Sequence, residues 1–202
     1  MEYFYHAYNY TTVCERTVEL PIAREFIARH AKFRSGLEVG NVLSHYGLRP
    51  DRFEVIDKYE LGEGVSNIDA VELNRPGHFD LIVSISTLEH VGIDDFPRDG
   101  EKVIRALKRL VESLTPGGAL LFTIPVGYNP ALDAFDLASL DRSARRTFLR
   151  RLSMDNRWGE AESLSREEAA YIHVASVTRL PDRPPYPFAG AICVWTIERP
   201  AG

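Results

Sequence analysis

The sequence has few of the features that mark several large classes of protein. Only two of its 202 residues are cysteines, Cys14 and Cys193, and their spacing fits neither a disulfide framework nor a zinc motif. No apolar run approaches the roughly 18 residues of a membrane span, and the first residues lack a basic start followed by an apolar stretch. We therefore expect a soluble, cytoplasmic protein with reduced thiols.

The chain also lacks an excess of basic residues. Its formal net charge is -5, which argues against a nucleic-acid partner because phosphate binding needs a basic surface. The histidines show no metal-ligand spacing, so we expect no metal. No internal repeat or linker divides the chain, and its 45% hydrophobic content is ordinary for a globular protein. We expect one domain over residues 1–202, and the sequence indicates no oligomeric state.

Strand and helix patterns alternate from residue 37 onward. Short apolar segments at 37–40 and 53–57 each end in or near an acid, and 41–46 has room only for a very short helix. Only eleven residues separate Asp57 from Asp69, whereas a parallel crossover with a helix needs roughly a dozen or more. A nearly continuous apolar run at 79–86 predicts a central parallel strand. This alternation indicates an α/β protein with shortened early helices.

The second half begins with a clear β-α-β unit. Apolar residues at helical spacing predict a helix over 103–114, and 119–125 reads as another buried strand. Residues 135–152 suggest a basic amphipathic helix, whose arginines form either a solvated face or a phosphate-binding surface. We further expect a strand around Trp158, a short helix over 165–173 and a final strand over 189–198.

Several of these segments together resemble the class I S-adenosylmethionine-dependent methyltransferases. The resemblance lies in Glu38-x-Gly40, in Asp57, in Asn67-Ile-Asp69, and in the stretches Phe79-Asp-Leu-Ile-Val-Ser-Ile-Ser-Thr-Leu-Glu-His90 and Leu114-Thr-Pro-Gly-Gly-Ala-Leu-Leu-Phe122. It covers roughly residues 35–128, and the order and spacing of the parts make it specific.

The resemblance implies a compact, three-layer Rossmann-like sheet, mostly parallel with an antiparallel last strand. Residues 8–30 look like the helical cap that many members of this family place over the cofactor. We therefore expect residues 1–34 to form a cap segment and residues 35–202 to form the α/β core. The implied cofactor is S-adenosylmethionine, with S-adenosylhomocysteine as product.

The resemblance also implies which residues bind this cofactor. Glu38 and Gly40 would lie beside its methionine part, and Asp57 would hold the ribose hydroxyls, unless it is only an exposed acid at a strand end. Asn67, Ile68 and Asp69 would border the adenine, although an acid in a loop is often a turn former. We also expect contacts from Asn41 and Ser86, which follow two of the strands. Arg16 either binds the cofactor's carboxylate or forms an intrahelical ion pair with Glu15 or Glu19.

The loop after the 79–86 strand carries the candidate for proton removal. Histidine accepts protons near neutral pH, so His90 is the expected catalytic base, with a structural role in the loop as the alternative. Residues expected to contact the acceptor, unless they are simply core, are Tyr8, Tyr10, Glu89, Tyr128, Asn129 and Trp158. The predicted reaction is methyl transfer to a small molecule. Oxygen is favoured over nitrogen as acceptor, for example in a sugar or another polyhydroxylated metabolite.

One departure from the family pattern keeps other functions open. Family members usually have a second glycine where this chain has Val42. A cofactor-binding or scaffold protein that kept the fold but lost turnover is therefore an alternative. A nicotinamide-dependent oxidoreductase is a third reading, with less support because the Gly-x-Gly-x-x-Gly pyrophosphate turn is absent.

Overall fold

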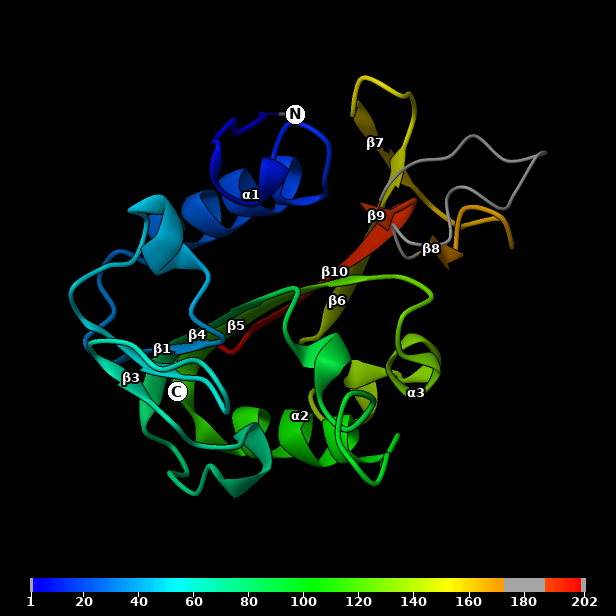
Figure 1. Ribbon diagram of the computed structural model, residues 1–202. Coiled ribbons are helices and arrows are strands. Elements are labelled where there is room, and N and C mark those ends of the chain that lie inside the picture. Colours follow the sequence, from blue (N-terminus) through cyan, green and yellow to red (C-terminus); the bar gives the residue numbers. More distant parts are fainter. Residues whose placement is uncertain (1, 173–187, 201–202) are drawn as a thin grey trace.

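The computed structural model describes residues 2–172 and 188–200. Its central feature is an eight-stranded sheet with the strand order β3-β2-β1-β4-β5-β10-β6-β7, and a separate two-stranded sheet pairs β8 with β9 (Figure 1). The strands are β1 (Gly36–Val39), β2 (Phe53–Ile56), β3 (Val65–Ser66), β4 (Phe79–Ile85), β5 (Leu114–Pro125), β6 (Arg145–Arg151), β7 (Trp158–Ala161), β8 (Tyr171–Ile172), β9 (Phe188–Ala189) and β10 (Ala191–Glu198).

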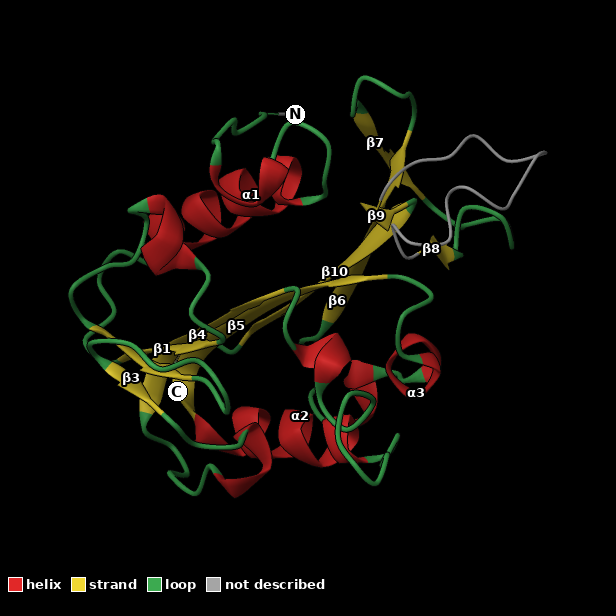
Figure 2. Cartoon of the chain, viewed as in Figure 1, coloured by secondary structure: helices red, strands yellow, loops and turns green. Residues whose placement is uncertain are grey.

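The helices lie on both sides of this sheet. The α-helices are α1 (Arg16–Arg29), α2 (Lys102–Ser113) and α3 (Pro130–Ala134), and the short 3-10 helices are η1 (Tyr8–Tyr10), η2 (Leu43–Tyr46), η3 (Ala70–Glu72), η4 (Leu88–His90) and η5 (Leu137–Ser139). The α1 helix covers one face, while α2 and α3 cover the other (Figure 2). The predicted three-layer α/β architecture is confirmed. No helix within the described ranges has the length and apolar character needed to cross a lipid bilayer.

Each face of the sheet has its own hydrophobic core. On the α1 side, Phe26 packs in one buried cluster with Leu81 and Leu121. On the α2 side, the predicted apolar stripe is buried, and Leu107 and Leu110 belong to a second cluster. Because side chains alternate across a strand, β4 and β5 supply residues to both clusters, which explains their continuous apolar sequences.

The first five strands run parallel, and their connections are short. β1 lies between β2 and β4, so the strand order reverses beside it. Only η2 links β1 to β2, as the short 41–46 segment predicts, and β3 has just two residues. The compact crossovers leave the carboxyl ends of these strands accessible.

The predicted basic helix over 135–152 is wrong. Residues 137–139 form η5, and Arg145–Arg151 forms strand β6, antiparallel to β10 and to β7. Seven residues, of which only Ala144 is apolar, separate Leu140 from Phe148 and interrupt the apolar stripe that suggested a helix. Pairing with β10 satisfies the backbone of the segment. The guanidinium of Arg146 lies over the Phe148 and Trp195 rings, at 5.0 and 5.2 Å from their centroids.

The end of the chain differs from expectation in a second place. The helix predicted over 165–173 is wrong up to residue 172, because turns at 166–169 lead into β8; His173 lies outside the described residues. The strand near Trp158 is confirmed as β7, and the antiparallel last strand is confirmed as β10.

Candidate functional site

A cavity opens at the carboxyl edge of the parallel strands, where β1, β2 and β4 end side by side. The register keeps these three strand ends at nearly the same level. The cavity has a volume of about 350 Å³ and is lined by Gly40, Asp57 and Ser86, each of which comes directly after one strand. Ligands of open α/β sheets bind at this edge, where the strand order reverses.

Gly40 lets the backbone approach the cavity closely. Its φ is +85°, which L side chains rarely adopt, and a Cβ at this position would lie 2.2 Å from Thr87 Oγ1. Its N–H donates to the Ile56 carbonyl at 2.8 Å, which holds the turn at the strand end. Both the conformation and the available space therefore require glycine here.

The Asp57 carboxylate is oriented by its own loop. Its Oδ1 accepts hydrogen bonds from the backbone N–H groups of Tyr59 and Glu60, at 2.8 and 2.7 Å. The side chain is half-buried and lines the cavity. A carboxylate held in this way is suited to accept two neighbouring hydroxyl groups.

A second hollow of about 160 Å³ adjoins this cavity. It is lined in part by Tyr8, Asn41 and Arg16, the first residue of α1. Residues shared by both hollows are Gly40, Asp57 and Thr87. The N-terminal segment and the strand ends therefore enclose one continuous cleft.

Arg16 ties α1 to the end of β4. Its Nη1 donates to Glu19 Oε2 at 2.8 Å, and its Nη2 donates to the Ser86 carbonyl at 3.3 Å. The Ser86 hydroxyl donates to Glu19 Oε1 at 2.6 Å, and Ser86 itself has a φ of +35°. The intrahelical ion pair is thus present, and it fixes the guanidinium at the edge of the cleft.

His90 belongs to a hydrogen-bonded pair at the other side of the cavity. Its Nδ1 lies 2.6 Å from Asp94 Oδ2, and its ring meets that of Tyr128 edge to face, with centroids 4.7 Å apart. A proton on Nδ1 directed at Asp94 leaves Nε2 as the acceptor nitrogen. His90 lines the cavity and its side chain is 48% exposed, so a proton taken from a ligand has a route to solvent.

The comparisons with known proteins agree with this geometry. No protein-family model and no curated protein sequence match the chain. Among solved structures, the N-methyltransferase NodS from Bradyrhizobium japonicum WM9, in complex with S-adenosyl-L-homocysteine, has a TM-score of 0.50 and 16% identity over 92% of this chain and 93% of NodS. A SAM dependent methyltransferase from Archaeoglobus fulgidus has a TM-score of 0.50 and 13% identity over 89% of this chain and 94% of its own. The chain has the class I methyltransferase fold.

Within this methyltransferase fold, Glu38 lies beneath the cleft and lines neither hollow. Its Oε1 accepts from the backbone N–H groups of Val42 and Leu43, at 2.8 and 2.7 Å, while Oε2 has no hydrogen-bond partner in the part of the chain described. Burial raises the pKa of Glu38 to about 7, against the effect of these two hydrogen bonds. Glu38 therefore holds the loop that follows Gly40.

The backbone conformation at Val42 does not require glycine. Its φ and ψ are -85° and -49°, an ordinary right-handed conformation at the start of η2, and its side chain is partly buried against the core on the α1 side. Val42 also lines the smaller hollow, so its side chain occupies space that a glycine would leave free.

The residues predicted to border the adenine divide into two groups. Ile68 and Asp69 line the larger cavity, whereas Asn67 holds the loop by donating to the carbonyls of Asp57 and Glu60, at 3.1 and 2.8 Å. Asp69 accepts from Lys102 Nζ at 2.6 Å and also caps η3.

Sequence reasoning missed several residues that line the larger cavity, namely Lys58, Tyr59, Thr87, Asp95 and Lys102. Lys58 and Thr87 directly follow a predicted site residue, and Tyr59 is the next residue after Lys58, so their position in the sequence was the available signal. Asp95 and Lys102 had no such signal, because the Asp95 carboxylate bridges Lys58 and Lys102 from a loop distant in sequence from Lys58.

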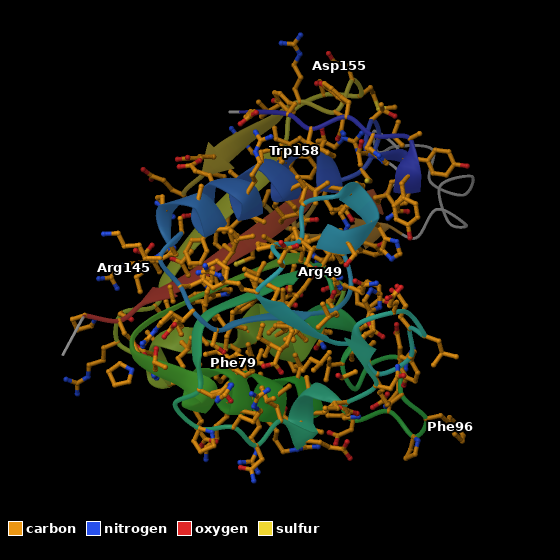
Figure 3. The ribbon with its side chains drawn as sticks, turned by 90° about the vertical axis from the view of Figure 1, so that its left-hand side faces the viewer. Arg49, Phe79, Phe96, Arg145, Asp155 and Trp158 are labelled. Carbon is orange, nitrogen blue, oxygen red and sulfur yellow. The ribbon has the colours of Figure 1, made fainter. Side chains whose placement is uncertain are left out.

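The aromatic residues predicted to enclose an acceptor are spread over the molecule. Tyr8 lines the smaller hollow and stacks on His45, with centroids 4.6 Å apart. Tyr10 is exposed and lines neither hollow. Trp158 is buried beside α1, in a separate hollow that also includes Phe26. Figure 3 shows Trp158 far from Phe96, the residue that follows the cavity residue Asp95.

The other three predicted acceptor residues lie together. Asn129 is buried, caps α3, and donates through Nδ2 to the Glu89 carbonyl at 3.1 Å. Tyr128 contacts His90, and Tyr171 meets Tyr128 edge to face at 5.0 Å. These residues form a group next to the cleft, and the Glu89 side chain is buried.

Proposed function

We propose that this protein transfers a methyl group from S-adenosylmethionine to a small-molecule acceptor. The observation that carries the proposal is the pair of strand ends in a class I methyltransferase fold, where Gly40 permits close approach and Asp57 is oriented by two backbone N–H groups. A nucleoside needs both features, since its ribose offers two hydroxyl groups to one carboxylate.

In this proposal each part of the cleft has a distinct task. Asp57 binds the ribose hydroxyls, while Ile68 and Asp69 border the adenine. Glu38 and Asn67 act indirectly, by holding the loops after β1 and β2. Arg16 lies at the methionine end, where the N–H groups that face neither Glu19 nor the Ser86 carbonyl are available for the carboxylate.

The cofactor supplies a methyl group already activated on a sulfonium, so the protein has to align the acceptor and remove a proton. His90 is placed for proton removal, with Asp94 orienting its ring. A His–Asp pair accepts a proton from a hydroxyl or from an ammonium group. The oxygen acceptor and the sugar expected from the sequence therefore have no specific support in the site.

The two alternative functions, a non-catalytic scaffold and a nicotinamide-dependent oxidoreductase, have less support than methyl transfer. The scaffold reading rested on the branched side chain of Val42, which lines the smaller hollow, while its backbone conformation does not require glycine. A nicotinamide reading still lacks the glycine-rich turn that a pyrophosphate requires. We keep a cytoplasmic location and a single domain as proposals; Cys14 and Cys193 are both free and buried, which supports reduced thiols.

Calorimetric titration tests the cofactor. We expect micromolar binding of S-adenosylhomocysteine and no binding of NAD. Asp57→Asn should weaken S-adenosylhomocysteine binding about 10- to 100-fold, the worth of one or two charge-assisted hydrogen bonds. Glu54→Gln is the matched control, because Glu54 lies on the same strand but is exposed and away from the cleft. Failure of the native chain to bind S-adenosylhomocysteine would refute the proposal.

Turnover is tested separately, with S-adenosylmethionine labelled on its methyl group and a panel of small alcohols, phenols and amines. His90→Ala should lower methyl transfer at least 100-fold at pH 7 without changing S-adenosylhomocysteine affinity. Unchanged turnover in this variant would remove His90 as the base. Binding of the cofactor without turnover on any acceptor would favour the scaffold reading.

A further inference from the structure

Among the described residues, no counter-charge lies at hydrogen-bonding distance from the buried carboxylate of Glu89. Its side chain is 2% exposed, and Oε2 has no hydrogen-bond partner within residues 2–172 and 188–200. The nearest titratable nitrogen is His90 Nε2, 3.7 Å from Oε1. A buried charge without a partner is costly, so this carboxylate is either protonated or completed by a ligand.

The surroundings of Glu89 have more acid than base. In the part of the chain that the structure describes, Arg16 is the cation whose charge lowers the pKa of Glu89, and it is already paired with Glu19 at 2.8 Å. Glu15 is also buried, and its Oε2 accepts a long hydrogen bond of 3.4 Å from the Ala189 N–H. If the three carboxylates are ionised, the group carries an excess of two negative charges.

Burial and mutual repulsion act on these groups together. Burial raises the pKa of Glu89 well above its ordinary value, and the charge of Arg16 only partly opposes this. Burial, followed by the charges of Glu15 and Glu89, raises the pKa of Tyr171 to about 12. A cation arriving here would lower the free energy of the ionised carboxylates.

A chain of aromatic rings begins at His90, whose Nε2 lies 3.7 Å from the Glu89 carboxylate. His90, Tyr128 and Tyr171 form consecutive edge-to-face contacts, with centroids 4.7 and 5.0 Å apart. Faces of aromatic rings attract ammonium groups. The combination of a buried carboxylate and aromatic rings is suited to an organic cation and offers little to a neutral polyol.

We infer that the methyl acceptor is an amine, which binds as its ammonium ion against the Glu89 carboxylate, beside His90. This inference rests on the proposed methyl transfer. The ammonium loses a proton to His90 Nε2, which frees the nitrogen lone pair. The nitrogen then forms a bond to the methyl carbon as the carbon–sulfur bond breaks and its electron pair returns to sulfur. The proton then passes from half-exposed His90 to solvent, so one proton is released for each amine that is methylated.

Glu89 could instead bind an ammonium group that belongs to the cofactor. S-adenosylhomocysteine retains that ammonium, so its binding reports whether Glu89 serves the cofactor. We expect Glu89→Gln to change S-adenosylhomocysteine affinity less than twofold. A loss of tenfold or more would assign Glu89 to the cofactor and overturn the inference.

The acceptor itself is probed on the native chain saturated with S-adenosylhomocysteine. The probes are pairs that differ only in an amine and a hydroxyl, such as 2-phenylethylamine with 2-phenylethanol and cyclohexylamine with cyclohexanol. We expect calorimetric binding, and methyl transfer from S-adenosylmethionine, for amines and not for their alcohols. Equal or stronger binding of the alcohols, or binding by no amine of the panel, would overturn the inference.

Glu89→Gln should then weaken binding of the amine tenfold or more, whereas Glu54→Gln leaves it unchanged. Thermal unfolding with and without S-adenosylhomocysteine shows that each variant is folded. The amine and alcohol pairs test the inference on the native chain, even if Glu89→Gln does not fold. Normal cofactor binding with a preference for alcohols would refute only the amine acceptor, whereas loss of cofactor binding in the native chain would refute the proposed function.

Discussion

Gly40 shows how one residue without a side chain makes the cleft. Its φ of +85° excludes most residues by conformation, and Thr87 occupies the space that a Cβ would need. Gly47 also has a positive φ, of +66°, but a Cβ there would meet nothing within 4 Å. Substituting Gly47 therefore tests the effect of the backbone conformation alone, whereas substituting Gly40 also tests the effect of a side chain that blocks the site.

Gly40→Ala should weaken S-adenosylhomocysteine binding at least tenfold, because the new methyl group displaces Thr87 into the cavity. Gly47→Ala should cost about 1–2 kcal/mol of stability for its left-handed conformation and leave affinity unchanged. Calorimetric titration and urea unfolding measure both effects. Equal affinities of the two variants would contradict the role assigned to Gly40.

At the scale of elements, the N-terminal segment is attached to the core by the turn between β6 and β7. Asn156, in this turn, is buried and donates through Nδ2 to the carbonyls of Thr11 and Cys14, at 3.2 and 2.9 Å. Its Oδ1 accepts from Trp158 Nε1 at 2.8 Å. This turn therefore sets where α1 begins, and with it the position of Arg16.

Asn156→Gly tests this attachment without adding backbone strain, since Asn156 has a φ of +62° that glycine adopts freely. We expect the free energy of unfolding to fall by about 3 kcal/mol, because the variant loses three hydrogen bonds of roughly 1 kcal/mol each. Amide hydrogen exchange should accelerate in residues 11–16 more than in β4. Asp155→Gly, at the exposed neighbouring position, removes only surface contacts with Ser153 and Arg157 and should lower the free energy of unfolding far less. A uniform acceleration over the whole chain would argue against a local attachment.

At the scale of the whole molecule, buried carboxyls couple stability to pH. The pKa of Glu38 is raised to about 7 by burial, above its ordinary value of 4.5. Between these two values the folded chain holds a proton that the unfolded chain has lost. The stabilisation is therefore fully present below about pH 4.5 and is lost as pH rises through 7.

We expect the free energy of unfolding contributed by Glu38 to fall by about 3 kcal/mol between pH 4.5 and 8. Glu38→Gln should flatten this part of the pH profile, because an amide oxygen still accepts the hydrogen bonds from Val42 and Leu43 but does not titrate. Urea unfolding across this range measures the slope. Asp133→Asn is a useful comparison, since burial raises the pKa of Asp133 to about 6. An unchanged slope in Glu38→Gln would contradict the assignment.

Much of the fold was predictable because its signals are local. The continuous apolar run of β4 and the apolar stripe of α2 depend only on neighbours in sequence, and both formed as predicted. Strand β6 was not predictable in the same way, since its partner β10 pairs Ala191 with Arg150 across 41 residues of chain. Its isolated sequence fits a helix about as well as a strand.

The candidate site likewise has some features that depend on local sequence and others that depend on contacts between distant segments. The sequence by itself determined the alternation of strands and helices and placed a glycine and an acid at two strand ends, because periodicity and turn chemistry act over a few residues. Only the tertiary structure decided that Thr87 lies over Gly40, that Lys102 bridges Asp69 and Asp95, and that Glu89 is buried with no partner for Oε2 in the described part of the chain. These features depend on burial and on charges brought together from distant segments, which no local pattern records.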